Sequence, residues 1–304
     1  MVVRAISILI AGAALAATLP AEAQTFTART VEIVDAAAVL RVIPEDRPDF
    51  SVETTPGPRL SAPRARMEGD RLVIDGRVRI SNCGAVWRGH EPSVRIVGVG
   101  SVPRSALPVI TIRAPRTVDL STHGAVFANI GASAGGRLSF DGCGDSTVGA
   151  ASGDLEVNLH GSGDVDVGPV AGMLQASLRG SGDLRAGDAQ SARLALAGSG
   201  DVSMETVRQG PLEASLGGSG DLRVASVLGG AVTMRLAGSG DLAVAQGSAD
   251  RLDAQLAGSG DLTFAGHVGV LDARLSGSGD LRVASADRIE GMHKAGSGDI
   301  TVGN

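Results

Sequence analysis

The chain has 304 residues, a formal net charge of −6 and 44 glycines, but only one tryptophan, five phenylalanines and no tyrosine. This composition excludes a conventional core built on aromatic packing. A mildly acidic chain with scattered arginines is also a poor nucleic-acid binder, so we expect no nucleic acid among its partners.

Residues 1–23 are typical of a secretory signal peptide. Arg4 supplies positive charge, an apolar run follows over residues 6–19, and Ala21-Glu22-Ala23 fits the A-x-A cleavage pattern. The apolar run is short for a membrane span, and we expect no transmembrane segment after cleavage. The mature protein is therefore predicted to be extracytoplasmic, either in the periplasm or at the cell surface and secreted.

Residues 24–117 are less regular. Alternating apolar residues predict strands over 31–42, 72–80, 94–99 and 109–112. The proline-rich stretch 44–63 between the first two predicts a loop. We interpret this region as wider coils or a capping layer on the structure that follows, with a separate small domain as the alternative.

Residues 118–304 continue the alternation and then carry a regular repeat. The tetrad Gly-Ser-Gly-Asp first occurs at 161–164, and its eight copies end at Asp164, Asp183, Asp201, Asp221, Asp241, Asp261, Asp280 and Asp299. Three alternating apolar residues precede each of the first seven copies, which predicts strands. A period of about 20 residues predicts a stack of coils. The expected fold class is therefore all-β, a single-stranded β-helix or β-solenoid with coils of about 19–20 residues.

The tetrad itself has a structural interpretation. Glycine permits positive φ and a close approach of adjacent coils. Aspartate side chains accept hydrogen bonds from nearby backbone N–H groups. A calcium-binding repeat is the alternative, but the calcium nonapeptide of secreted proteins differs in both period and aspartate position. We therefore expect a structural aspartate column, with no metal and no cofactor.

Cys83 and Cys143 are the only two cysteines. An oxidising compartment allows a disulfide between them, and two unpaired cysteines are the alternative. Neither has metal-ligand spacing. At the other end of the chain, Glu290, Met292 and Lys294 fall where earlier coils have inward apolar residues, which predicts that the last coil is a cap.

The strands of the first hundred residues, the segment Ile110-Thr111-Ile112-Arg113-Ala114-Pro115 and the serial Gly-Ser-Gly-Asp-Leu-x-Val coils resemble one known family. It is the putative auto-transporter adhesin head GIN domain family, and the resemblance covers residues 30–304. It implies a right-handed β-solenoid that is exported by Gram-negative bacteria, with no established enzymatic activity.

The leading hypothesis is an exported, non-catalytic, adhesin-head-like structural or binding module of the bacterial envelope, with an unknown envelope polymer or protein as partner. A polysaccharide-acting β-helix enzyme is the alternative. That chemistry needs a distinct pair of carboxylates, which a uniform column does not single out. Arg185, Arg223 and Arg282 recur at one outward position, but intervening coils have Ser203, Ala243 and Thr263 there. Trp87 is the single aromatic candidate for stacking on a sugar. The five histidines share no spacing: His90, His123, His160, His267 and His293. We expect no catalytic residue.

Overall fold

The computed structural model describes residues 23–84 and 91–303, where nearly every element is a β-strand. The predicted signal peptide lies almost wholly outside these residues, as do Trp87 and His90. The strands at the N-terminal end are β1 (Gln24–Phe26), β2 (Thr30–Glu45), β3 (Phe50–Thr55), β4 (Arg64–Glu68), β5 (Arg71–Asp75), β9 (Val109–Pro115) and β10 (Thr117–Ile130). Beside them lie β6 (Ile80–Gly84), β7 (Ser93–Ile96), β8 (Gly100–Pro103) and the short 3₁₀ turn η1 (Arg104–Ala106).

The remaining strands build the coils. Those that lead into the corner turns are β11 (Gly135–Gly142), β13 (Leu155–Gly161), β15 (Val170–Leu178), β17 (Ala189–Leu196), β19 (Leu212–Leu216), β21 (Ala231–Leu236) and β23 (Gly247–Leu256). Those that leave the corners are β12 (Ser146–Val148), β14 (Val165–Val167), β16 (Leu184–Ala186), β18 (Val202–Val207), β20 (Leu222–Leu228), β22 (Leu242–Val244) and β26 (Ile300–Val302). In β24 (Leu262–Leu275) and β25 (Leu281–Lys294), one long strand spans both positions.

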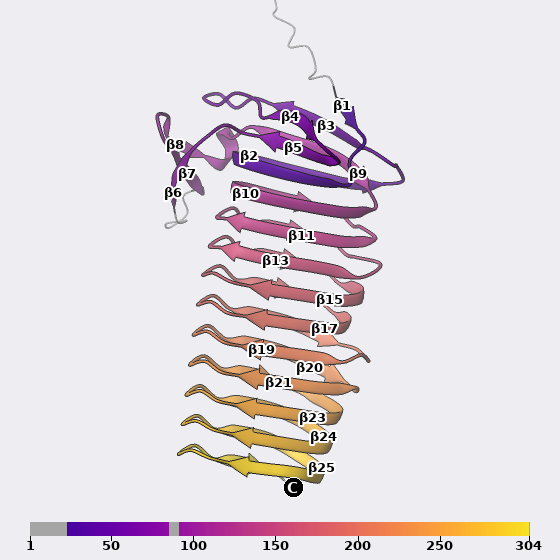
Figure 1. The fold of residues 1–304 in the computed structure, drawn as a ribbon, viewed down its shortest axis with the longest axis vertical. Coiled ribbons are helices and arrows are strands. Elements are labelled where there is room, and N and C mark those ends of the chain that lie inside the picture. Colours follow the sequence, from indigo (N-terminus) through magenta and orange to yellow (C-terminus); the bar gives the residue numbers. More distant parts are fainter. Residues whose placement is uncertain (1–22, 85–90, 304) are drawn as a thin grey trace, which may run out of the picture.

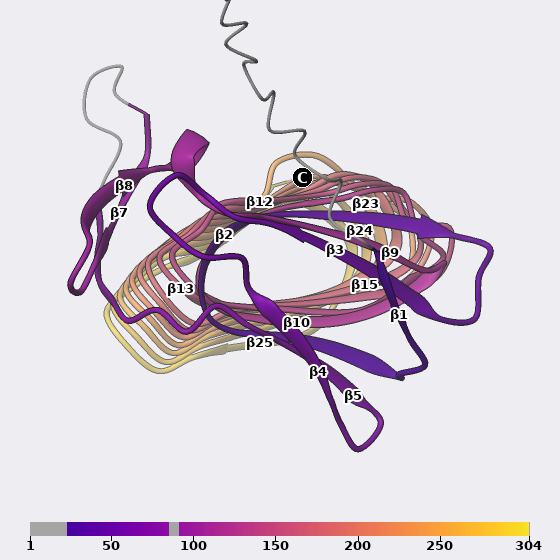
Figure 2. The same ribbon diagram turned by 90° about the horizontal axis from the view of Figure 1, so that it is seen from above.

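Successive coils pair in parallel and in register. Leu216 lies beside Leu236, and Leu236 beside Leu256, across β19, β21 and β23. The coils therefore stack as a column, and seen from above each coil is displaced slightly from the one before it (Figures 1 and 2). The predicted β-solenoid is confirmed, with each coil about 19 residues long.

The core is the set of inward side chains that the alternation predicts. Before each of the first seven tetrads the three apolar residues are buried, and Leu216, Leu236 and Leu256 are at most 2% exposed. Their polar neighbours face outward because successive side chains of a strand point to opposite faces. Leu, Val and Ala thus form continuous ladders through the inside of the stack.

Glycine is required at the corners for close approach. A Cβ on Gly240 would lie 1.9 Å from the carbonyl oxygen of Gly220 in the coil before it. The positive φ that glycine also allows is found at the first two corners, at Gly142 and Gly161, and at none of the later tetrads. The repeated glycines therefore reflect the spacing between coils more than a left-handed backbone.

The N-terminal end is closed by strands that leave the parallel pattern. Strand β2 lies between β10 on one side and β5 and β9 on the other, all parallel to it. Strands β3 and β4 then pair antiparallel with β9 and β5, and β1 with β3. These strands share one sheet with the coils. The division of the chain at residue 117 stays a prediction.

The opposite end differs from the expected cap in one residue. Strand β25 has a register shift against β24, so that Leu271 pairs with Ile289 and Asp272 pairs with Gly291. Glu290 is the extra residue and does not lie in an inward slot. Ile289, Met292 and Lys294 lie beside the inward residues of β24 instead, and all three are exposed because no coil follows within the described residues.

Candidate functional site

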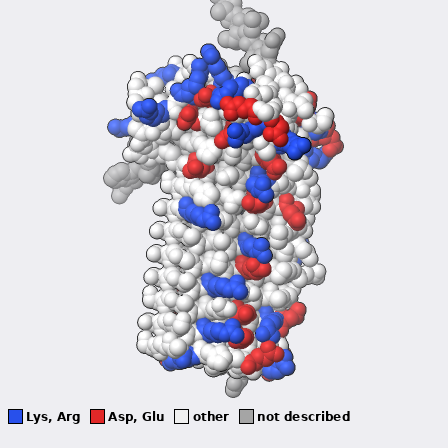
Figure 3. Space-filling model, viewed as in Figure 1, with Lys and Arg blue, Asp and Glu red and all other residues white. Residues whose placement is uncertain are grey.

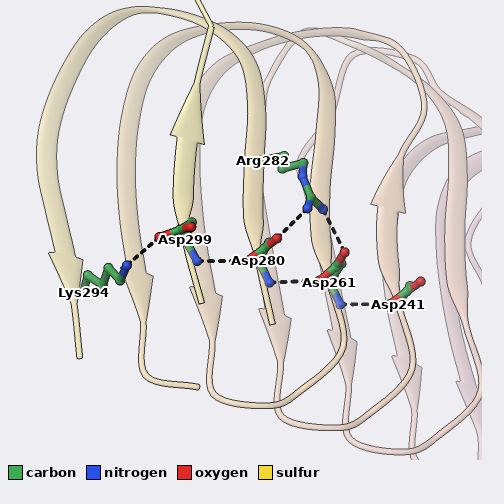
Figure 4. Close-up of polar contacts among 6 residues, drawn as sticks. All are labelled: Asp241, Asp261, Asp280, Arg282, Lys294 and Asp299. Atoms are coloured by element: carbon green, nitrogen blue, oxygen red, sulfur yellow. Dashed lines mark hydrogen bonds and ion pairs between the residues drawn. The ribbon is translucent and has the colours of Figure 1, made fainter. Parts of the chain in front are cut away.

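The tetrad aspartates form a hydrogen-bonded ladder along one corner of the solenoid. In each coil the backbone N–H of the aspartate donates to Oδ1 of the aspartate in the coil before it. The bond from Asp261 to Asp241 is 2.8 Å, and those from Asp280 to Asp261 and from Asp299 to Asp280 are both 2.9 Å (Figure 4). The series begins at Asp164, whose N–H donates to Asp145 of the looser copy, at 3.2 Å.

A second bond crosses each coil boundary in the opposite direction. The backbone N–H of Leu242 donates to the carbonyl oxygen of Asp261 at 2.9 Å, and Leu222 bonds to Asp241 in the same way. Each aspartate therefore ties its coil to both neighbours. The sequence predicts an acceptor for corner N–H groups, but the donors belong to the adjacent coil rather than to the same corner.

The second carboxylate oxygen, Oδ2, is available to cations on the outer face. Arg282 bridges two coils, because its guanidinium lies 2.8 Å from Asp261 and 2.5 Å from Asp280 (Figure 4). Arg185 contacts Asp183 at 2.9 Å. At the end of the column, Lys294 donates to Oδ1 of Asp299 at 2.6 Å, in the place of the N–H that another coil would supply.

These contacts hold the pKa of Asp261 below its usual value, first through the N–H of Asp280 and then through Arg282. A carboxyl whose folded-state pKa is depressed stabilises the fold above its unfolded-state pKa, and this stabilisation is lost as the pH falls through the folded-state pKa. The pKa of Asp299 is lowered in the same direction by Lys294. The contacts of Asp261 and Asp299 are thus the acid-sensitive part of the column.

Two substitutions of Asp241 distinguish the role of its side chain as a hydrogen-bond acceptor from the role of its negative charge. Asp241→Asn keeps an oxygen that can accept the N–H of Asp261, so we expect a loss below about 1 kcal/mol in the free energy of unfolding. Asp241→Ala leaves that N–H without its partner and is expected to cost about 1–3 kcal/mol. Chemical denaturation measures both, with the exposed Asp250→Ala as control. Severe unfolding by Asp241→Asn, or equal effects of the two alanine variants, would contradict the ladder.

Within residues 23–84 and 91–303, no group of three or more histidine, cysteine, aspartate or glutamate side chains is placed to hold a metal ion. The tetrad carboxylates lie one per coil, and each except Asp299 accepts the backbone N–H of the next tetrad aspartate with Oδ1. Calcium prefers six to eight oxygen ligands, including carboxylates that chelate it with both oxygens. A structural column without calcium stays our prediction.

Histidines form two small polar groups that the sequence did not suggest. His123 lies between Glu32 and Asp141, at 3.5 and 3.3 Å. His267 lies 3.1 Å from Ser285 Oγ through Nδ1 and 3.2 Å from Asp287 through Nε2. The only sequence signal for the second group is the separation of 18 and 20 residues, about one coil.

The group around His267 has the residue types of a serine triad but not its geometry. In that triad a buried aspartate holds Nδ1, and the serine bonds to Nε2. Here Nδ1 of His267 faces the serine and Nε2 faces the aspartate, the reverse of the triad. The side chain of Asp287 is also 69% exposed. We therefore assign no catalytic role to Ser285.

Cys83 and Cys143 join the outer three-stranded sheet to the solenoid. Their Cα atoms are 6.2 Å apart and the structure pairs them as a disulfide. Cys143 stands where later tetrads have serine, while Cys83 is in β6. Strands β6–β8 lie outside the column (Figure 2) and pack on outward residues of β2 and β10 such as Ala37 and Phe127. The oxidation state of the pair in the exported protein stays a prediction.

Cys143→Ser restores the tetrad serine and tests this pairing. The bond closes a separation of 60 residues, which in the chain-entropy account is worth about 4 kcal/mol. We expect the variant and the reduced parent to unfold at the same, lower denaturant concentration. Thiol titration of the unfolded parent, purified without reductant, should find no free thiol. Two free thiols in that sample would contradict the disulfide.

The outer face carries charges in rows and has shallow hollows. On the face in Figure 3, charged side chains gather over the N-terminal strands and along one column of the coils, while the edge on the left is almost uncharged. One hollow of about 450 Å³ is lined by Arg185, Arg223, Asp166 and Glu205, which balance in charge. Two of the three arginines that recur in the sequence therefore meet in one place, and Arg282 does not join them.

Comparison with known proteins agrees with the sequence pattern. The family model described as "putative auto-transporter adhesin, head GIN domain" matches residues 98–227 and 189–304. The chain belongs to this family. The two matched segments of the GIN domain overlap, as expected when one coil is repeated many times. The family is described as the head of an adhesin and not as an enzyme.

Solved structures similar to this GIN-domain protein include a putative adhesin from Bacteroides fragilis NCTC 9343, with 16% identity, 92% of this chain and 95% of that chain covered, and a TM-score of 0.36. A putative adhesin from Parabacteroides distasonis ATCC 8503 has 14% identity, the same coverage and a TM-score of 0.39. A putative lipid binding protein from the same organism has 16% identity, 93% and 98% coverage and a TM-score of 0.35. With such low scores, these likenesses carry no argument about function.

No match was found among curated proteins. In the part of the chain that the structure describes, none of the elements is a helix with the length and apolar character needed to cross a bilayer.

Proposed function

We propose that this protein is an exported, non-catalytic module of the bacterial envelope that binds an envelope polymer or protein with the outer face of its solenoid. Membership of the adhesin-head family supports an extracytoplasmic location. The predicted signal peptide supports export.

The observation that carries the proposal is the register of the outer face. Outward residues of adjacent coils lie directly beside one another, as Arg185, Ser203 and Arg223 do across β16, β18 and β20. Parallel strands repeat every 4.7–4.9 Å or so along the stack. A rigid surface with such a repeat suits an elongated polymer or a protein partner. None of the polar groups described above has the geometry of a catalytic centre.

Fractionation of the native host tests the location. We expect the mature protein, cut after Ala23, in the periplasmic or surface fraction. Protease added to intact cells distinguishes these two, since only a surface protein is degraded. Accumulation of the uncut chain in the cytoplasm would overturn the proposal.

Binding is tested with the purified mature protein and isolated envelope material. We expect the folded protein to co-sediment with the envelope material. Protein that was denatured beforehand should stay in the supernatant. Failure of the folded protein to bind any envelope fraction would remove the binding function while leaving the location intact.

A further inference from the structure

The C-terminal end of the outer face has a hollow of about 710 Å³. It lies over the ends of β23, β24 and β25, where Gln255, Arg274 and His293 are neighbours in register. Lys294, the next residue, also lines it. Arg274, His293 and Lys294 thus come together from two adjacent coils.

The residues that line this hollow differ in charge from those of the hollow around Arg185. There, two arginines are balanced by Asp166 and Glu205. Here, three basic side chains line the hollow and no carboxylate is among the described lining residues. Ser276 and Gln255 add a hydroxyl and an amide. The side chains that line this hollow are therefore rich in hydrogen-bond donors.

Lys294 is unusual in the chain because it is the only lysine. It lies beside Leu275, which is buried, but no strand within the described residues covers it, and its side chain contacts Asp299. Its side chain is 42% exposed. A lysine at this place blocks the addition of another coil and at the same time brings a flexible cation to the hollow.

We propose that this hollow binds a phosphate ester through Arg274, His293 and Lys294. This inference deepens the proposed binding function, on which it rests, by naming a class of ligand. Arginine offers a planar fork that matches phosphate oxygens, and lysine adds a mobile point charge. The hydroxyl of Ser276 can donate to a further oxygen of the ester.

The basic groups are already paired, and a ligand has to compete with these contacts. Arg274 lies 2.7 Å from Asp272 and 3.6 Å from Asp253, and Lys294 lies 2.6 Å from Asp299. The pairs of Arg274 with Asp253 and of Lys294 with Asp299 are partly exposed, and such pairs contribute little, about 0–1 kcal/mol. The Asp272 side chain is only 14% exposed, so a ligand has to leave its contact with Arg274 in place. The five N–H donors of Arg274 also exceed its two carboxylate contacts. A phosphate with two negative charges can therefore displace the carboxylate from Lys294 and bind the N–H donors of Arg274 that the carboxylates leave free.

The single lysine makes a direct probe of the site. Reductive methylation with ¹³C formaldehyde labels Lys294 and the N-terminal amine of the mature protein while both keep their charge. We expect the ¹³C signal of Lys294 to shift in a saturable way with glycerol 3-phosphate, at ionic strength matched with sodium chloride. The signal of the N-terminal amine should not move and is the internal control.

Two matched variants locate the effect. Arg274→Gln should weaken the binding of glycerol 3-phosphate about tenfold, because a hydrogen-bonded charge is lost. Arg193→Gln removes a comparable surface ion pair from an earlier part of the solenoid, where Arg193 lies 2.9 Å from Glu213. This variant should bind glycerol 3-phosphate as the parent does. An equal response of the two variants, parallel shifts of both labelled amines, or no shift at all would overturn the proposal.

A second arm identifies the source of the phosphate. Vesicles with phosphatidylglycerol are compared with vesicles of phosphatidylcholine alone. A response to glycerol 3-phosphate only supports a soluble or polymer ester, and an added response to phosphatidylglycerol supports a lipid headgroup. If Arg274→Gln loses neither response and the protein still binds envelope material, the phosphate site is wrong while the proposed binding function stands.

Discussion

Replacing Leu236 with aspartate is expected to unfold the middle of the solenoid. Leu236 is 1% exposed and lies in the ladder between Leu216 and Leu256. A carboxylate at this position has no partner for its charge, and the apolar contacts of leucine are lost as well. We expect a loss of more than about 4 kcal/mol in the free energy of unfolding.

Leu228→Asp is the matched control, because Leu228 is 55% exposed on β20. The same change of side chain there should cost within about 0.5 kcal/mol. Circular dichroism during denaturation measures both variants. A Leu236→Asp protein as stable as the control would mean that the ladder is not the core.

Gly240→Ala is expected to have the second largest effect. The new methyl group would lie 1.9 Å from the carbonyl oxygen of Gly220 and 2.7 Å from its carbonyl carbon. These are backbone atoms of a packed coil and cannot rotate away as a side chain would. We expect a loss of about 3 kcal/mol, as for other strained insertions into a packed interior.

Gly217→Ala, just before an earlier tetrad, separates this clash from the general effect of removing a glycine. A Cβ at Gly217 meets only one atom, at 3.9 Å. Because alanine reduces the freedom of the unfolded chain, Gly217→Ala should be neutral or stabilise by up to about 1 kcal/mol. Thermal melts of the two variants compare them directly. Equal melting points would show that adjacent corners have room for a methyl group.

The sequence predicts the coils well because their signals are local. The alternation around Leu216, Leu236 and Leu256 and the regular aspartates specify both the inward face and the corner. The donors to the aspartate oxygens are not local, since Asp261 reaches Asp241 only once the coils are stacked. The hydrogen bonds therefore follow from the register, which no single coil encodes.

Two further features could not be predicted for similar reasons. Strand β2 pairs with β5, β9 and β10, all distant in sequence, and no periodicity signals this order. The register shift in β25 moves Glu290 out of the slot that a simple count gives it. The hollow near Arg274 and Lys294 also depends on this last coil, which is why the repeat alone does not reveal it.

The central claim is that the aspartate column holds the coils together through backbone N–H groups and not through calcium. The most direct measurement is a thermal melt of the mature protein in millimolar calcium, in matched magnesium and with chelator. We expect the same midpoint in all three. If calcium bridged the column, a hundredfold excess over its Kd would add about 2.7 kcal/mol and raise the midpoint by about 5 °C or more. A rise of that size with calcium alone would contradict the claim.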